Sequence, residues 1–333
     1  MKLKKSRQGL RRDTLFVAVL SGFVLVYPLT AGAAQGGGRP VSMGGAFVAV
    51  ADDVHAASWN PAGLAWQKEQ EMTYSGIINN RGDYVSGDFI SDDYIAYARP
   101  LKTGYQNVSD NQGGIGVYFH NSGYENDATR AKTTLWQPGI SYGRRFSADD
   151  NMAWGVALNY YSFDSEVPGA TSSDTAISAN LGFLWYFSDE ITLGFLWENV
   201  NEPSFTVHGV KNRLTRVLRP GIAYYFSSKT LVSCDIYDLT GNTGDQGADF
   251  SQNVRIGFEH YINDAVSVRL GAHHPNSDVD SSKYYSFGLG FQRSDFLGIY
   301  PISYFLDYTF IAWENAPADM SEYTHQVGVT FKF

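Results

Sequence analysis

Apolar and polar residues alternate with a period of two along most of this chain. The end of the chain shows it most clearly: one face carries Tyr323, His325, Val327, Val329, Phe331 and Phe333, and the other carries Thr324, Gln326, Gly328, Thr330 and Lys332. Successive side chains of a β-strand point to opposite faces, so this pattern predicts a strand with one apolar and one polar face.

The same alternation recurs from about residue 70 to the last residue. It predicts about fourteen strands, most near the 9–11 residues that cross a bilayer at a tilt. They are expected near 70–79, 92–100, 113–121, 135–146, 151–163, 174–187, 190–200, 216–226, 229–239, 251–262, 264–273, 283–292, 300–310 and 322–333. Pro138 and Pro220 fall inside two of them, where a missing N–H is a candidate defect in the wall or an irregularity without function.

The predicted connections alternate between short and long. Tight turns are expected at 147–150, 188–189, 227–228 and 263–264, and longer polar loops at 122–134, 164–173, 201–215, 240–250 and 274–282. Outer-membrane barrels sort their connections in this way, with short periplasmic turns and longer outer loops. A secreted β-sandwich has no reason to do so. We therefore predict an all-β fold, a transmembrane antiparallel barrel of about fourteen strands with both termini in the periplasm.

The beginning of the chain has the pattern of a secretory signal. A basic start precedes an apolar run at 15–29, too short for a comfortable bilayer span, and Ala31-Gly32-Ala33 supplies a small-residue cleavage pattern. Removing residues 1–33 leaves 19 Lys and Arg against 33 Asp and Glu, a net charge of −14. That balance argues against a nucleic-acid partner. The single Cys234 excludes an intramolecular disulfide.

Residues 34–69 fit neither a plain strand nor a long helix. They are rich in Gly and Ala, contain Asp52-Asp53, and end in Asn60-Pro61-Ala62-Gly63-Leu64. A barrel of about fourteen strands is too wide for its own side chains to fill, so something must plug it. We predict that 34–69 form this plug and 70–333 the barrel, the alternative for 60–64 being only a turn into the first strand.

Several residues within the predicted plug have expected local roles. Asn60 before Pro61 suits a helix N-cap and first turn. Gly44 and Gly45 allow the backbone to approach the wall closely. The spacing of Phe47, Val50 and Val54 predicts one buried face of a short helix. Asp52 and Asp53 are carboxylates of the kind that bind Ca²⁺, although solvated loop acids are the interpretation that we favour.

The run from Met43 to Asp53, followed by the Asn60-Pro61-Ala62-Gly63-Leu64 turn, resembles the N-terminal hatch of the FadL-like superfamily of outer-membrane barrels. It is especially similar to the branch with PorV-type proteins. The resemblance implies a fourteen-stranded barrel with an N-terminal hatch that includes Gly44, Gly45, Phe47, Asp52, Asp53, Asn60, Pro61, Ala62 and Gly63. FadL-like proteins take up long-chain fatty acids or aromatic hydrocarbons; PorV-type relatives serve as partners in protein secretion. Phe333 resembles the C-terminal signal that the barrel assembly machinery recognises.

The sequence offers little catalytic chemistry. It contains no H-E-x-x-H and no paired Cys spacing, and we predict neither catalytic residues nor a metal or cofactor. A membrane acyl hydrolase built from a lone Ser and His is the alternative that stays open. His273 and His274 are neighbours on a predicted strand, where adjacent side chains point to opposite faces, so a metal-binding pair is not expected.

Inward-facing positions supply the candidate ligand contacts. Alternation places charged and aromatic side chains inside the barrel, and the candidate ligand-binding residues are Arg219, Arg255, Arg269, Tyr225, Tyr261 and Phe305. An inward guanidinium suits a carboxylate. The alternative, which we favour for any single arginine, is a ladder of opposite charges that stiffens the wall.

Together these patterns predict a passive outer-membrane channel for hydrophobic molecules such as long-chain fatty acids. Its expected partners are outer-membrane lipid, the hydrophobic molecule and, through Phe333, the barrel assembly machinery. The alternative is a PorV-type interaction protein that supports secretion or surface attachment. The predicted loops are modest, which leaves little docking surface and favours the channel.

Overall fold

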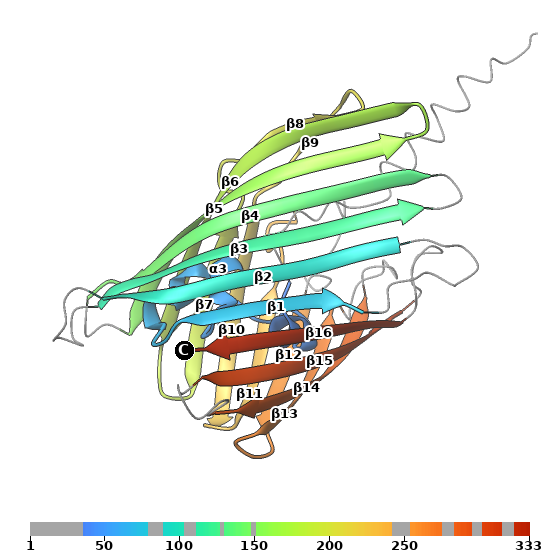
Figure 1. Cartoon of the computed structure of the whole chain (residues 1–333). Helices are drawn as coiled ribbons and strands as arrows, with labels where there is room; N and C mark the ends of the chain where they lie inside the picture. The colour runs from blue at the N-terminus through green and yellow to red at the C-terminus, as the bar shows by residue number, and fades with distance from the viewer. Residues whose placement is uncertain are drawn as a thin grey trace, which may run out of the picture. The chain divides into compact units, whose positions relative to one another are not determined.

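The computed structural model describes residues 36–78, 89–102, 111–126, 130–147, 151–241, 254–274, 283–294, 302–314 and 323–333. The predicted leader, 1–33, lies outside these ranges. Fourteen antiparallel strands close into a barrel, and β1 completes it by pairing with β16, from Glu71 opposite Lys332 to Ile77 opposite Gln326 (Figure 1). The predicted fold class and strand number are confirmed.

The strands follow the chain order around the barrel. The barrel strands are β1 (Glu71–Ile77), β2 (Phe89–Lys102), β3 (Asn111–Asn126), β4 (Ala131–Arg145), β5 (Met152–Val167), β6 (Ala170–Tyr186), β7 (Ile191–Glu198), β10 (Val217–Ser227), β11 (Thr230–Ile236), β12 (Val254–Tyr261), β13 (Val266–His273), β14 (Tyr284–Arg293), β15 (Ser303–Trp313) and β16 (Tyr323–Lys332). A separate two-stranded sheet, β8 (Ser204–Val207) with β9 (Val210–Arg213), lies between β7 and β10 in the chain.

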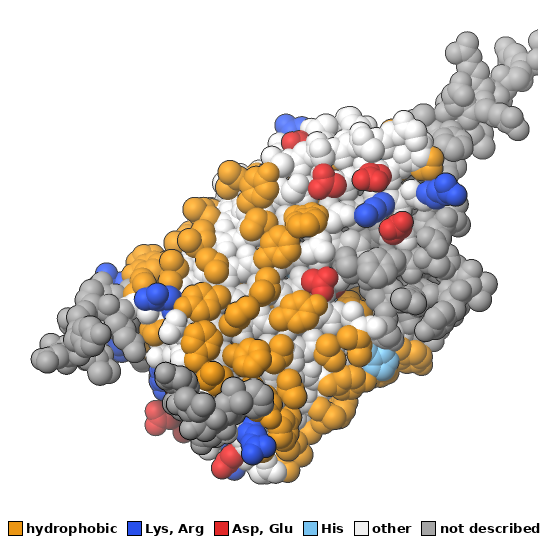
Figure 2. Space-filling model, in the orientation of Figure 1, with side chains coloured by type: hydrophobic (Ala, Val, Ile, Leu, Met, Phe, Trp, Pro, Cys, Tyr) orange, Lys and Arg blue, Asp and Glu red, His pale blue; other side chains and the backbone are white. Residues whose placement is uncertain are grey.

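Alternation of burial along the strands separates an apolar outer face from a mixed inner face. On β5, Trp154, Leu158 and Tyr160 are exposed outward, whereas Ala157 and Asn159 are buried inward. Apolar side chains cover much of the outer face seen in Figure 2, and charged ones gather toward the ends of the strands. No helix among the described residues is long and apolar enough to cross a membrane.

The long loop predicted at 164–173 is wrong, because β5 and β6 stay paired to Val167 opposite Ala170. The prediction at 122–134 is wrong in part, since β3 continues to Asn126 and β4 begins at Ala131. The added residues are polar on both faces, so no hydrophobic period marks them as strand. The predicted loops 240–250 and 274–282 fall largely outside the described residues.

The β8–β9 hairpin occupies most of the loop predicted at 201–215. Phe205 of β8 stacks on Phe163 of β5, with ring centroids 3.7 Å apart, and both rings are 2 % exposed. Asp174 of β6 accepts a hydrogen bond from the Thr206 amide at 2.6 Å. Since Phe163 faces inward, the hairpin covers the inner face of the extended β5–β6 pair (Figure 1).

Candidate functional site

Residues 36–69 form what we call the interior segment, which is enclosed by the barrel wall (Figure 1). Its helices are short: α2 (Gly38–Ser42), α3 (Ala56–Trp59) and the 3-10 helix η1 (Pro61–Trp66). Phe47 and Trp59 meet edge to face at 5.9 Å in a core where both are 2 % exposed or less. The helix predicted from the spacing of Phe47, Val50 and Val54 is wrong. Val50 and Val54 lie in turns, and the Phe47 carbonyl accepts only the amides of Val50 and Ala51 among the backbone bonds described.

Glycines of the wall receive the backbone of this segment. A Cβ added at any of nine inward positions would lie within 3.0 Å of an atom of the interior segment. We call them the wall glycines: Gly114, Gly116, Gly143, Gly155, Gly182, Gly194, Gly257, Gly271 and Gly288. Several are direct cross-strand partners, among them Gly143 with Gly155 and Gly155 with Gly182. They form a belt of inward positions without side chains at one level of the barrel.

The Asn60-Pro61 turn packs directly on this belt. The Asn60 side chain accepts the Ala62 amide and donates to the carbonyls of Val48 and Phe183, and Pro61 opens η1. The predicted cap and first turn are therefore confirmed. Asn60 and Ala62 are fully buried. Gly63 lies against the Ala51 carbonyl so closely that a Cβ there would clash with it.

Gly44 and Gly45 reach the opposite part of the wall. Both have positive φ, 63° and 73°, a conformation that favours glycine. A Cβ on Gly44 would lie within 3.0 Å of the Ala272 backbone, and one on Gly45 would lie 2.9 Å from an Arg255 nitrogen. The close approach predicted for this pair is what the structure shows.

Arg39 anchors the interior segment to the wall through ion pairs near the end of the barrel where tight turns join the strands. Its guanidinium donates to both carboxylate oxygens of Glu259, at 2.9 and 2.7 Å, and pairs with Asp52 at 2.5 Å and Asp53 at 2.8 Å. Arg269 extends the network, donating to Glu259 at 2.7 Å and to Asp307 at 2.5 Å. Asp53 is buried, so the favoured interpretation of Asp52-Asp53 as solvated loop acids is wrong for Asp53.

The charges in this network hold one another in place. Burial opposes ionisation of Asp53, but His55 and Arg39 outweigh it and keep the pKa of the carboxyl well below its usual range. Burial likewise opposes the charge on Arg39, yet Asp52, Glu259 and Asp53 raise its pKa well above the ordinary value. At neutral pH Arg39 and Asp53 are therefore both ionised.

A second anchor lies at Asp235 of β11. One carboxylate oxygen accepts the amides of Phe47, at 2.8 Å, and Val48, at 3.0 Å, and also pairs with Arg219 at 3.2 Å. Arg219 donates in turn to the Gly45 carbonyl. Both charged groups are at most 1 % exposed. The wall thus supplies the hydrogen-bond partners that the irregular backbone of residues 45–48 lacks.

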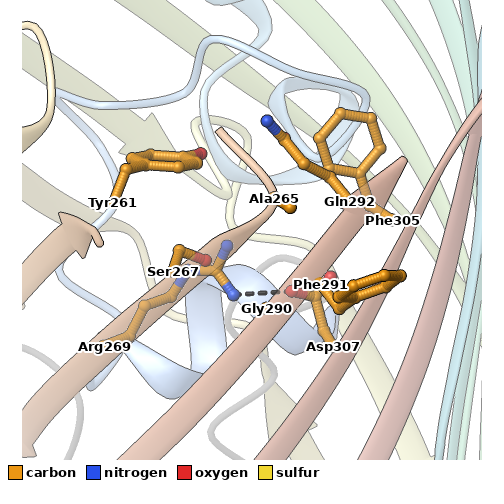
Figure 3. Close-up of a pocket in the computed structure, with 9 residues that line it drawn as sticks. All are labelled: Tyr261, Ala265, Ser267, Arg269, Gly290, Phe291, Gln292, Phe305 and Asp307. Atoms are coloured by element: carbon orange, nitrogen blue, oxygen red, sulfur yellow. Dashed lines mark hydrogen bonds and ion pairs between the residues drawn. The ribbon is translucent and has the colours of Figure 1, made fainter. Parts of the chain in front are cut away.

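The structure divides the six predicted ligand-binding residues into two sets and one separate residue. Arg219 and Arg255 lie beside Gly45, whereas Arg269, Tyr261 and Phe305 line a cavity of about 10 Å³ near the strand ends (Figure 3). That space holds about one water molecule. Tyr225, the sixth, packs against the buried core of the interior segment. Arg219 and Arg269 make the ion pairs that the charge-ladder alternative expects; binding of a ligand by these residues stays a prediction.

His273 and His274 lie side by side, contrary to the expectation that they point to opposite faces. Their ring centroids are 4.0 Å apart, because β13 ends at His273 and His274 adopts a positive φ of 47°. Tyr284 stacks on His273 at 4.4 Å, and Tyr237 lies 5.8 Å from His274. In the part of the chain that the structure describes, no three His, Cys, Asp or Glu side chains gather to hold a metal ion.

Sequence reasoning missed the wall glycines, Asp235 as an anchor, and the cluster around His274. The glycines did leave a signal, since β3 to β7 and β12 to β14 each carry at least one at an inward position. The other two left none, because their roles depend on which strands become neighbours and on one turn in the backbone.

Comparisons with known proteins show the fold. The chain matches no protein-family model and no curated protein sequence. It is similar in structure to the toluene transporter TodX of P. putida, with a TM-score of 0.61 and 13% identity over 90% of this chain and 98% of that one. The Ralstonia pickettii toluene transporter TbuX and a Pseudomonas aeruginosa FadL homologue each give 0.56 at 12% identity, over 90% of this chain and 98% and 96% of theirs. The FadL-like fold implied by the motif is therefore confirmed.

Proposed function

We propose that this protein is an outer-membrane channel for passive uptake of small hydrophobic molecules, with residues 34–69 as its hatch. The observation that carries the proposal is an apolar-faced barrel whose lumen holds a segment fitted to it by the wall glycines. The fold shared with structures described as toluene transporters and a FadL homologue supports the same substrate class.

The outer face supports a membrane location. Outward residues are apolar from Met152 to Tyr160 on β5, whereas Ser162, Asp164 and Glu166 follow toward the extended end. Eight residues rise about 26 Å along a strand, which at a tilt of about 40° approaches the apolar band of roughly 25 Å that outer-membrane barrels present. The extended ends of β5 and β6 then project beyond the bilayer, on the outer side if both termini are periplasmic.

Passage requires the hatch to move in this proposal, because its core fills the lumen at the level of the wall glycines. Met43, Phe47 and Leu64 are fully buried there. A Cβ on Gly257 would lie 3.0 Å from that of Met43 and 2.8 Å from the Met43 carbonyl oxygen. A disulfide needs roughly 3.5–4.5 Å between Cβ atoms, so it forms here once the two backbones move apart by about 1 Å. Met43→Cys with Gly257→Cys, in a Cys234→Ser background, therefore allows the hatch to be locked and released by oxidant and reductant.

Uptake tests the proposal directly. Cells whose outer membrane lacks other hydrophobic channels should take up radiolabelled toluene or a long-chain fatty acid faster when they produce this protein. In the double-cysteine variant, oxidation should abolish the gain and reduction should restore it, which controls for damage by the substitutions themselves. Uptake no faster than in cells without the protein would refute the channel; equal uptake in both redox states would refute a moving hatch.

The interaction-protein alternative has one observation in its favour. The β8–β9 hairpin and the extended β3–β6 strands offer more ordered surface than the modest loops expected from the sequence. It expects co-purification of secreted proteins and normal uptake in a deletion strain, so the uptake experiment separates the two.

A further inference from the structure

Three polar atoms of uncharged groups in the lumen near Arg255 have no hydrogen-bond partner among the described residues: the Tyr237 hydroxyl, His273 Nδ1 and His274 Nε2. Tyr237 is 2 % exposed and His274 is 7 % exposed. Buried polar groups are nearly always hydrogen-bonded, and exceptions need an explanation. Three such atoms in one place point to something that binds there.

These atoms belong to neighbouring positions on the inner wall. Arg255 on β12 is the cross-strand partner of His273 on β13, which is the partner of Tyr284 on β14. Their rings overlap as a row, with Tyr284 stacked on His273 at 4.4 Å and His274 beside it at 4.0 Å. His273 and Tyr284 point inward and are partly exposed, so both rings are reached by solvent. We call Tyr237, His273, His274 and Tyr284 the His–Tyr cluster.

The charged groups beside the cluster compensate one another. Arg219 pairs with Asp235 at 3.2 Å and with Glu198 at 3.7 Å, and the Arg255 guanidinium lies 4.4 Å from the Tyr237 ring centroid. The charge of Arg219 is thus matched by two carboxylates. The uncharged atoms left to bind a ligand are a hydroxyl and imidazole nitrogens, which donate or accept hydrogen bonds without requiring a charge. Arg219 Nε and Asp235 Oδ1 also have no hydrogen-bond partner in the described part of the chain, but they belong to groups that already pair with each other.

From this geometry we infer that the His–Tyr cluster binds an uncharged aromatic molecule that carries one oxygen, of the phenol type. The aromatic ring lies against the row of rings, and the oxygen exchanges hydrogen bonds with Tyr237 and the histidines. The inference rests on the proposed function and names a substrate class for it. A plain hydrocarbon leaves the three polar atoms unsatisfied, and sites built to bond a hydroxyl discriminate strongly against analogues that lack one.

Equilibrium dialysis of the full-length mature protein in lipid nanodiscs tests the inference, with phenol, toluene and benzoate as radiolabelled probes and empty nanodiscs as the blank. Phenol should bind saturably and at least about tenfold more tightly than toluene or benzoate, the discrimination that roughly one lost hydrogen bond gives. Tyr237→Phe and His274→Phe should each weaken phenol binding about tenfold and leave toluene binding unchanged.

Tyr161→Phe is the matched control, since it removes the hydroxyl of another buried, inward tyrosine, on β5, and should not alter phenol binding. Tightest binding of benzoate would overturn the inference in favour of an anion site at the two arginines. Equal affinities for phenol and toluene, or phenol affinity unchanged in both cluster variants, would overturn it as well. Uptake of toluene without phenol binding would refute this inference alone, whereas phenol binding without uptake would refute the channel.

Discussion

Replacing Gly155 by alanine tests whether the wall glycines hold the interior segment in place. An added Cβ would lie closer than 3.0 Å to the Pro61 carbonyl carbon and oxygen and to the Ala62 nitrogen. All three are backbone atoms of the buried η1 turn, so a side-chain rotation cannot relieve the clash. Either the turn or β5 must shift.

The expected magnitude follows from overpacking. Extra methyl groups in a well-packed core cost about 1–3 kcal/mol. The clash exists only while the segment is docked, whereas the gain of roughly 0.5–1 kcal/mol from removing a strand glycine applies to the barrel in either state. The state in which the interior segment has left its docked position should therefore become about 5- to 150-fold more populated. Gly328→Ala is the matched control, because its Cβ would meet nothing nearer than 3.4 Å.

Thiol labelling reads out this population. Ser58 of α3 is 2 % exposed and its hydroxyl lies 2.8 Å from that of Tyr94, so Ser58→Cys in a Cys234→Ser background should be protected while the segment is docked. Adding Gly155→Ala should accelerate labelling by that factor, and adding Gly328→Ala should not. Labelling of the Gly155→Ala and Gly328→Ala variants at equal rates would refute the reasoning, provided that both remain folded barrels, as judged by heat-modifiable migration in gel electrophoresis.

Three further predictions concern the anchors and the hairpin. Arg39→Gln should lower the free energy of unfolding by about 1.5–3 kcal/mol, because buried Glu259 and Asp53 each lose one charged hydrogen-bond partner and keep another, Arg269 and His55. Urea denaturation should show a change of at most about 1 kcal/mol for the exposed pair broken by Lys229→Gln. Because folding lowers the pKa of Asp53, the contribution of its charge to the free energy of unfolding is complete above the unfolded pKa of roughly 4 and is lost as pH falls through the folded value. The melting temperature should therefore fall more steeply below pH 4 in the wild type than in Asp53→Asn. Parallel curves for the two proteins would contradict this. Phe205→Ala removes the stack on Phe163 and should expose the β8–β9 hairpin to trypsin, a change that an unaltered digestion pattern would disprove.

Strand number and closure were accessible from the sequence because the outer face is apolar and alternates. The ends of β5 and β6 were not, since Ser, Thr, Asp and Glu on both faces carry no hydrophobic period. Asn60 capped as expected because its partner, Ala62, is two residues away. Longer contacts escaped prediction: the pairing of Arg39 with Glu259 depends on the closed barrel.

At His273 and His274 a single backbone angle makes the rule of alternating side chains give the wrong prediction. Alternation separates neighbouring side chains only while the strand continues, and β13 stops at His273. The positive φ of His274 then returns its ring to the same side. No feature of the sequence at this position distinguishes that outcome from a strand one residue longer.

The wall glycines also set an order of assembly. The interior segment precedes every strand in the chain, yet the wall glycines that receive it lie on β3 through β14, so its contacts exist only after most strands have paired. Its helices, of four to six residues, are too short to persist alone. The interior segment must therefore fold late, inside a barrel wall that has already formed. Barrel assembly has to keep it unfolded and on the inner side of the wall until β1 pairs with β16.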